Sequence, residues 1–166
     1  TGILRLVTEG RLTLDAPVAD LVSGVAFDNP WAASDPIRVR HLLDQTAGLD
    51  DARIAHVFSV RVGADMPLAE AVAAGQPLLH VRSRPGTRHS YSNIGYTLAG
   101  MVIETVTGTR YETYLDMHLL QPLGMHDSTF AFTTQAGAAG DPRIAMGHFE
   151  RGEAHARQDR RQAAFV

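Results

Sequence analysis

The segment from Ile94 to Thr107 places the tightest constraint on what this chain can fold into. Its apolar residues recur at the spacing of one helical face. Gly108 follows directly, at a position where a residue in the left-handed conformation ends many helices. Such a helix has to bury its apolar face, and 166 residues are enough for one domain with a core. We therefore predict a helix over residues 94–107, whose inward side chains are Leu98, Met101, Val102 and Thr105 or Val106.

Shorter helical patterns flank this segment. They cover residues 1–9, which end before Gly10, then residues 40–45, and the stretch between Asp65 and Gly75. Thr109–Glu112 has the spacing of a capping box, in which the Thr and Glu side chains bind backbone N–H groups at a helix start. The side chains expected to face inward are Ile3, Leu4, Leu6 and Val7 in the first helix, and Tyr111, Tyr114, Leu115 and His118 or Leu119 in the last.

The remaining segments are predicted to be turns, loops and short extended pieces. Residues 11–36 are rich in turn formers, and Pro85–Gly86 marks a turn. Beyond Pro122 the chain is expected to be irregular, with a mobile loop at 135–140 and a hairpin formed by 144–149 and 153–157. Residues 150–161 carry four Arg, but acidic residues interrupt the basic run. That pattern favours a solvated surface loop over a polyanion site.

The composition lacks both Cys and Lys, so all 15 basic residues are Arg. Without Cys there is no disulfide, thiolate nucleophile or Cys-based metal site. Without Lys, this chain by itself cannot complete a mechanism that needs an ε-amino group. The net charge of −3 and the 45% apolar content are ordinary for a globular chain and argue against a basic nucleic-acid binder. No stretch reaches the roughly 20 apolar residues of a transmembrane helix.

Several common site motifs are missing. No two of the eight His lie at i, i+2 or i, i+4, and no His-Glu-x-x-His occurs. We therefore expect no metal or other cofactor, and we expect His41 and His118 to be partly buried, hydrogen-bonded helix residues. The nucleophile elbow Gly-x-Ser-x-Gly is absent, and so are the glycine loops that bind phosphates.

The candidate site is the polar segment Arg84–Tyr96, which leads from a Pro-Gly turn into the strongest helix. Tyr91 and Asn93 are two residues apart, and in an extended loop this spacing puts both side chains on one side. A phenol and an amide could then bind one molecule. The alternative is a purely structural role, in which Ser92 or Asn93 caps the helix and Tyr91 packs at its end.

Four blocks of the chain resemble, in order and spacing, the serine β-lactamase-like family, which includes class C β-lactamases, D-alanyl-D-alanine carboxypeptidases and related esterases. The blocks are residues 6–18, 37–49, 85–96 and 122–125, and the resemblance covers roughly residues 3–132. It implies an α+β, β-lactamase/transpeptidase-like fold, with this chain holding mainly the helical part and little of the sheet. Many members read His-Thr-Ser-Gly-Leu where this chain has Gln45–Leu49, which indicates a divergent member.

Enzymes of this family use three motifs: Ser-x-x-Lys, Tyr-x-Asn, and Lys-Thr-Gly or His-x-Gly. Only the second is present, as Tyr91-Ser92-Asn93. The resemblance therefore implies that residues 1–166 are a partial domain, lacking the N-terminal and C-terminal motifs. It assigns Tyr91 to catalytic proton transfer and Asn93 to binding the acyl-side amide carbonyl of a substrate. It also implies that Ser92 serves the backbone and that Tyr96 packs in the core.

By resemblance, the parent protein is a serine hydrolase that forms an acyl-enzyme with a β-lactam, a D-alanyl-D-alanine peptide or a small ester. Its partners would be small-molecule or peptide substrates and not nucleic acid, and a periplasmic or extracellular location is favoured. The isolated chain is expected to be inactive. One alternative is a non-catalytic binding or regulatory homologue of the same fold. Another is an unrelated small helical interaction domain that is complete at 166 residues.

Overall fold

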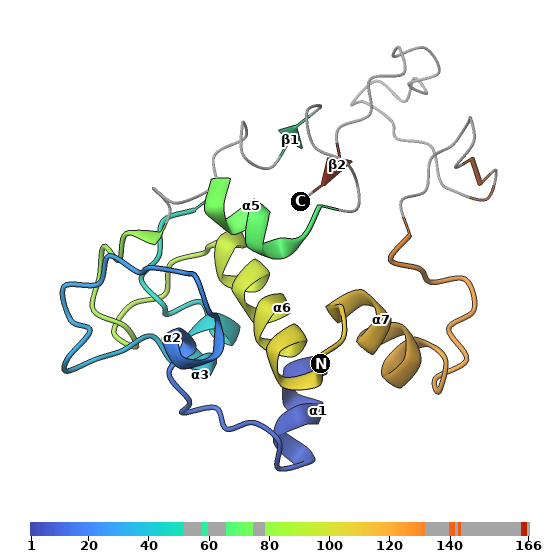
Figure 1. Ribbon diagram of the computed structural model, residues 1–166, viewed down its shortest axis with the longest axis horizontal. Helices are drawn as coiled ribbons and strands as arrows, with labels where there is room; N and C mark the ends of the chain where they lie inside the picture. Colours follow the sequence, from blue (N-terminus) through green and yellow to red (C-terminus); the bar gives the residue numbers. More distant parts are fainter. Residues whose placement is uncertain are drawn as a thin grey trace.

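The computed structural model describes residues 1–51, 58–59, 66–74, 79–131, 140–141, 143 and 164–165. This part of the chain is mainly helical and has little sheet, as predicted. Its elements are α1 (Gly2–Thr8), α2 (Val18–Leu21), α3 (Val39–Leu43), β1 (Phe58–Ser59), α5 (Leu68–Ala74), α6 (Asn93–Thr107), α7 (Tyr111–Leu115), the π-helical turn η2 (Asp116–Leu120) and β2 (Ala164–Phe165) (Figure 1).

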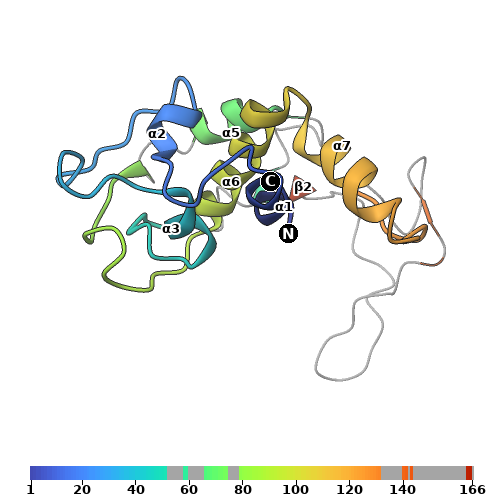
Figure 2. The same cartoon turned by 90° about the horizontal axis from the view of Figure 1, so that it is seen from below.

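Helix α6 lies at the centre of this structure. All the other α-helices described pack against it, with α2 and α3 on one side and α7 on the other (Figures 1 and 2). Its observed bounds agree to within one residue with the predicted 94–107. Leu98, Met101 and Val102 are buried, as predicted. Of the two alternatives for the last turn, Val106 is partly buried against the core and Thr105 is exposed. The helical spacing of its apolar residues therefore identified the buried face of α6 correctly.

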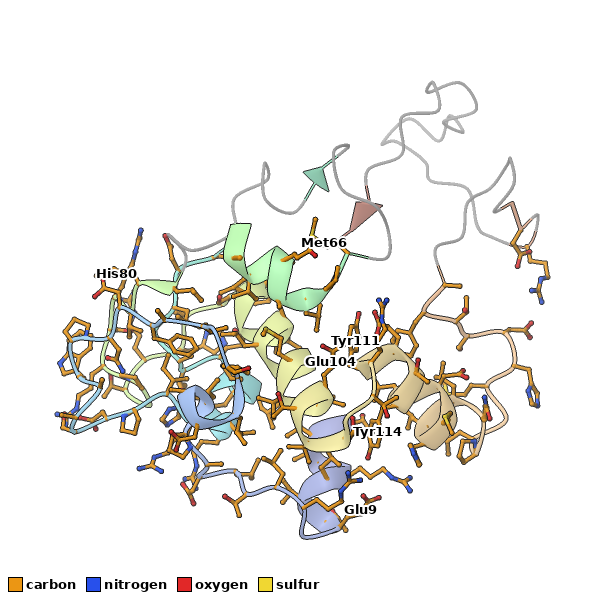
Figure 3. The ribbon with its side chains drawn as sticks, viewed as in Figure 1. Glu9, Met66, His80, Glu104, Tyr111 and Tyr114 are labelled. Carbon is orange, nitrogen blue, oxygen red and sulfur yellow. The ribbon has the colours of Figure 1, made fainter. Side chains whose placement is uncertain are left out.

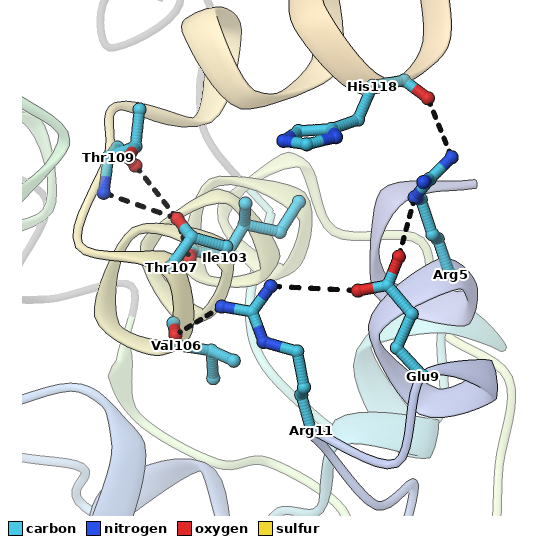
Figure 4. A network of polar contacts seen from close by, with 8 residues as sticks. All are labelled: Arg5, Glu9, Arg11, Ile103, Val106, Thr107, Thr109 and His118. Atoms are coloured by element: carbon cyan, nitrogen blue, oxygen red, sulfur yellow. Dashed lines mark hydrogen bonds and ion pairs between the residues drawn. The ribbon is translucent and has the colours of Figure 1, made fainter.

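The C-terminal end of α6 is capped by a residue in the left-handed conformation and by an arginine from another segment. Gly108 has a φ of +67°, which a side chain would make unfavourable, and its N–H donates to the Glu104 carbonyl at 2.8 Å. The guanidinium of Arg11 donates to the Val106 carbonyl at 3.0 Å (Figure 4). The predicted end of the helix is confirmed, and two of its last carbonyls have partners.

The predicted capping box at Thr109–Glu112 is wrong. Helix α7 begins at Tyr111, and the N–H of Tyr111 donates to the Glu104 carboxylate of α6 at 3.2 Å (Figure 3). Glu112 instead accepts from the Arg110 guanidinium at 2.9 Å. Because the turn at Gly108 folds the start of α7 back toward the last turns of α6, a carboxylate from the preceding helix reaches the N–H that a local box would bind.

The face that α7 and η2 turn inward was predicted well. Tyr114 is 3% exposed, and Tyr111 and Leu115 are partly buried. Of the two alternatives for the last position, Leu119 is partly buried, whereas His118 is exposed, so the predicted partial burial of His118 is wrong. Its ring packs on Tyr114 with 4.6 Å between centroids, and its main-chain carbonyl accepts from Arg5 at 2.8 Å (Figure 4). The bond from Arg5 attaches η2 to α1.

Helix α1 contacts α6 through a narrow face. Ile3 and Leu6 are buried and Val7 is partly buried, but Leu4 is 52% exposed. The prediction that Leu4 shares this face is wrong, because each residue turns the helix by about 100°, which places Leu4 about 160° away from the buried Leu6.

The connection over residues 11–36 contains short extended pieces, as predicted, and one unpredicted helix, α2. Isolated bridges join Pro17 to Arg38 and Asp28 to His80. β1 pairs with β2 in antiparallel register, with Phe58 opposite Phe165. The predicted helices at 40–45 and between Asp65 and Gly75 correspond to α3 and α5.

Some of the predictions for the C-terminal part cannot be compared with the structure. The hairpin at 144–149 and 153–157 and the surface loop at 150–161 lie outside the described residues, and so does nearly all of the loop at 135–140. In the part of the chain that is described, none of the helices has the length and apolar character needed to cross a bilayer.

Replacing Glu104 with Ala should lower the free energy of unfolding by about 1 kcal/mol, because the first N–H of α7 would lose its side-chain acceptor. Urea denaturation followed by circular dichroism would measure this. Glu112→Ala is the matched control. It removes only the pair with Arg110, so it should cost less than about 0.5 kcal/mol. Equal losses in the two variants would contradict the assignment of the cap to Glu104.

Candidate functional site

Tyr91 and Asn93 lie side by side where the chain enters α6. Tyr91 ends an extended segment and is 60% exposed, and Asn93 is the first residue of the helix. The Tyr91 hydroxyl donates to Asn93 Oδ1 at 3.0 Å. The prediction that the two side chains share one side is confirmed by this bond.

The Asn93 amide is held from its other end by a carboxylate. Asp51 Oδ1 accepts from Asn93 Nδ2 at 3.0 Å and from the Asn93 backbone N–H at 2.8 Å. A carboxylate can only accept, so the NH₂ group faces Asp51 and the amide oxygen faces Tyr91. The three side chains form a chain of directed hydrogen bonds from Tyr91 through Asn93 to Asp51.

The structural alternative for this segment does not hold. Ser92 occupies the N-cap position but makes no side-chain cap bond to the helix. Its hydroxyl donates to the Asp50 carbonyl at 2.8 Å, so Ser92 serves the backbone, as predicted. The acceptor for the first N–H of α6 comes from Asp51, and Tyr91 projects into solvent.

Gln45 holds the extended segment that carries Tyr91. Its carbonyl accepts from the Ser90 N–H at 2.8 Å, and its side-chain oxygen accepts from the Ser92 N–H at 2.9 Å. In an extended chain the N–H groups of alternate residues point to the same side. One residue therefore binds both N–H groups that flank Tyr91. Gln45 does so from the left-handed region, with a φ of +62°.

The segment that follows Gln45 is anchored on a second extended piece. Leu49 pairs with Val81, and the Gly48 carbonyl accepts from the Arg82 N–H at 2.8 Å. Gly48 has a φ of +74°, and a Cβ there would lie 2.1 Å from the Ser83 carbonyl oxygen. Only glycine fits this close approach, so the 45–49 block and residues 81–83 have a fixed separation.

His41 supports the turn upstream of Tyr91. Its Nδ1 accepts from the Arg38 backbone N–H at 3.1 Å, which closes the start of α3. Its Nε2 lies against the turn at Gly86, where an added Cβ would be 3.1 Å away. Burial lowers the pKa of His41 from its ordinary value of 6.5, and the nearby Arg40 and Arg38 also lower it, opposed by Asp44 and Asp15. His41 is partly buried, as predicted.

Tyr96 does not pack in the core, so that prediction is wrong. It is 55% exposed, and its hydroxyl lies 3.4 Å from the Leu43 carbonyl. The helical turn places it near the exposed Asn93 and away from the buried Leu98.

Among the described residues, no group of three or more His, Cys, Asp or Glu side chains is placed to hold a metal ion. The chemistry that the site offers is that of one hydroxyl and one amide, held in fixed orientation on an open surface.

Sequence reasoning identified these two groups and missed Gln45 and Asp51. The only signal for Gln45 was its place in a block that differs from the usual family sequence.

Comparisons with known proteins match nearly the whole chain. The family model described as beta-lactamase matches residues 1–164. Penicillin-binding protein 4 of Amycolatopsis lactamdurans is 33% identical over 153 residues, covering 89% of this chain and 36% of that protein. Protein flp of Staphylococcus aureus is 31% identical over 132 residues, covering 80% of this chain and 26% of that protein.

Solved structures agree with these matches. The octameric penicillin-binding protein homologue of Pyrococcus abyssi superposes with a TM-score of 0.70 at 30% identity, over 92% of this chain and 35% of that one. The penicillin-binding protein of Bacillus halodurans gives 0.65 at 26% identity, over 92% of this chain and 44% of that one. The chain thus spans less than half the length of these relatives.

The lowered pKa of His41 predicts that acid destabilises the fold. The native state resists protonation at His41 while the unfolded chain does not. The stability contributed by neutral His41 is therefore complete above about pH 6.5 and is lost as pH falls below it, toward the lowered value. His41→Gln keeps a side-chain acceptor for the Arg38 N–H without titrating. Between pH 7 and 5, the thermal midpoint should fall more in the unmodified protein than in this variant. Parallel pH dependences in the two proteins would refute the assignment.

Proposed function

Because this chain belongs to the beta-lactamase family of serine hydrolases, we propose that residues 1–166 are the Tyr-x-Asn part of a longer hydrolase that works through an acyl-enzyme. The observation that carries this proposal is the 3.0 Å hydrogen bond between the exposed Tyr91 hydroxyl and the Asn93 amide oxygen. The serine nucleophile and its lysine partner belong to segments outside residues 1–166, since this chain has no Lys.

Tyr91 is the proton-transfer group in this proposal. Its own proton is donated to Asn93, so the lone pairs of its oxygen remain on the open side. A neutral phenol cannot take up a second proton, so Tyr91 acts as the base after losing its own proton to solvent, and the ammonium group of the lysine outside residues 1–166 stabilises the phenolate. The phenolate oxygen accepts the proton of the serine hydroxyl as it attacks the substrate carbonyl, and the phenol returns that proton to the leaving group.

Asn93 binds the substrate in this proposal. One N–H of its amide is used by Asp51, and the second is directed to the acyl-side carbonyl oxygen of the substrate. An amide does this without adding a charge to the site. Because Asp51 and Tyr91 hold the amide at both ends, it binds that carbonyl in one orientation.

The substrate is an amide or ester that can acylate a serine, and we propose a β-lactam, a D-alanyl-D-alanine peptide or a small ester. Names of similar proteins support this range: penicillin-binding protein 4 of Amycolatopsis lactamdurans, and a putative D-alanyl-D-alanine carboxypeptidase of Escherichia coli that is 28% identical over 139 residues. By the family resemblance, we also propose a periplasmic or extracellular location for the parent protein.

In the full-length protein, Tyr91→Phe should lower kcat by about 10²–10⁴-fold with little change in KM, because only proton transfer is lost. Asn93→Ala should raise KM as well as lower kcat. Hydrolysis of a chromogenic cephalosporin and of a p-nitrophenyl ester would measure both parameters. Tyr96→Phe is the matched control, because it is an exposed tyrosine near the start of α6, and it should leave both near their unmodified values. Full activity in Tyr91→Phe would refute the catalytic role of Tyr91, whereas no hydrolysis by the unmodified full-length protein would favour the non-catalytic binding homologue.

The isolated chain of residues 1–166 should not hydrolyse either substrate above background, because it lacks the nucleophile and the lysine. The same two assays would test this with purified protein. Turnover by the isolated chain that disappears in Tyr91→Phe would show that a complete site lies within these residues, and it would overturn the proposed division of motifs.

A further inference from the structure

Asp51 joins two parts of the candidate site that are far apart in sequence. It follows the 45–49 block and lies 42 residues before Asn93, yet one oxygen of its carboxylate accepts both the backbone and the side-chain N–H of that residue. The first contact caps α6. The second has no part in capping, because it fixes only the side-chain amide.

The position of the Asp51 carboxylate is itself supported. The Asp51 N–H donates to Asp50 Oδ1 at 3.1 Å, and the Asp50 carbonyl accepts from the buried Ser92 hydroxyl at 2.8 Å. Arg82 pairs with the Asp50 carboxylate at 2.5 Å. Residues 50 and 51 are therefore fixed against the start of α6 from both directions.

The oxygen of Asp51 that accepts from Asn93 decides which way the Asn93 amide points. With the carboxylate in place, the amide oxygen faces Tyr91 and the Tyr91 hydroxyl has to donate. If the amide were reversed, its oxygen would face a carboxylate, and its NH₂ would occupy the lone pairs of the Tyr91 oxygen. The N–H that the proposal directs to the substrate carbonyl would then point elsewhere.

We propose that Asp51 is a positioning residue of the active site, which orients the Asn93 amide so that its second N–H is directed to the substrate carbonyl. This inference rests on the proposed function. Asp51 touches neither the substrate nor the reacting atoms. It acts by keeping the amide oxygen of Asn93 toward Tyr91 and the second amide N–H toward the substrate.

The test uses the full-length protein and the cephalosporin and ester assays. Asp51→Ala should lower kcat by about 10- to 100-fold, as expected for a misplaced catalytic group, with a smaller change in KM. Asp51→Asn keeps an oxygen that can accept from both Asn93 groups, so it should recover most of the activity. In the Asn93→Ala background, Asp51→Ala should cause no further loss of kcat, because the residue through which it acts is already gone.

Asp44→Ala is the matched control. The Asp44 carboxylate also accepts one backbone N–H and one side-chain donor, both from Thr46, and it has no bond to Asn93 or Tyr91. It should lower the thermal midpoint to a similar extent without lowering kcat. If Asp51→Ala loses stability but not kcat, or if its effect multiplies with that of Asn93→Ala, Asp51 is only a cap and the inference is overturned.

A spectroscopic measurement covers the case in which Asp51→Ala does not fold. In protein labelled with ¹⁵N-asparagine, the side-chain amide signal that disappears in Asn93→Ala identifies Asn93. This signal should move in Asp51→Asn, because its N–H then binds a neutral oxygen, and it should not move in Asp44→Asn. An unchanged signal in Asp51→Asn would overturn the inference. Failure of the proposed function is a separate result, namely full activity in Tyr91→Phe and Asn93→Ala.

Discussion

The attachment of residues 90–93 to the 45–51 segment is the contact on which the rest of the site depends. Gln45 binds the two N–H groups that flank Tyr91, the Asp50 carbonyl binds the Ser92 hydroxyl, and Asp51 binds Asn93. Each bond gives a hydrogen-bond partner to a backbone or buried polar group, in place of the water that it loses on folding. The same bonds leave only the Tyr91 and Asn93 side chains projecting into solvent. The hydrogen bonds that satisfy the backbone here are therefore the same bonds that hold the Tyr91 and Asn93 side chains in position.

Sequence patterns predicted the elements well wherever the cause was local. The buried face and the end of α6 follow from helical spacing and from Gly108, and the shared side of Tyr91 and Asn93 follows from their separation of two residues. The failures share a different cause. The cap of α7 comes from Glu104 of the preceding helix, and Leu4 is exposed because the contact between α1 and α6 is narrow. Both outcomes depend on how helices pack, which periodicity does not report.

The residues that support the site could not be predicted from the sequence for the same reason. Asp51 and Gln45 lie more than 40 residues before the groups that they bind, and neither carries a local pattern. An Asp or Gln in a loop is usually a solvated turn residue. The family resemblance placed Gln45 inside a block of expected sequence, but it gave that residue no role. Only the folded arrangement brings the two acceptors to the start of α6.

A cap supplied from a distant segment has a consequence that a local cap would not have. If Ser92 bound the first N–H groups of α6 itself, as an N-cap residue usually does, the helix could form without the 45–51 segment, and the Asn93 amide would be free to rotate. With Asp51 in that role, the helix start becomes ordered only when the two segments meet, and the amide is oriented in the same step. The site is thereby preorganised by the tertiary contact, at the cost of making local stability and the orientation of Tyr91 depend on one carboxylate.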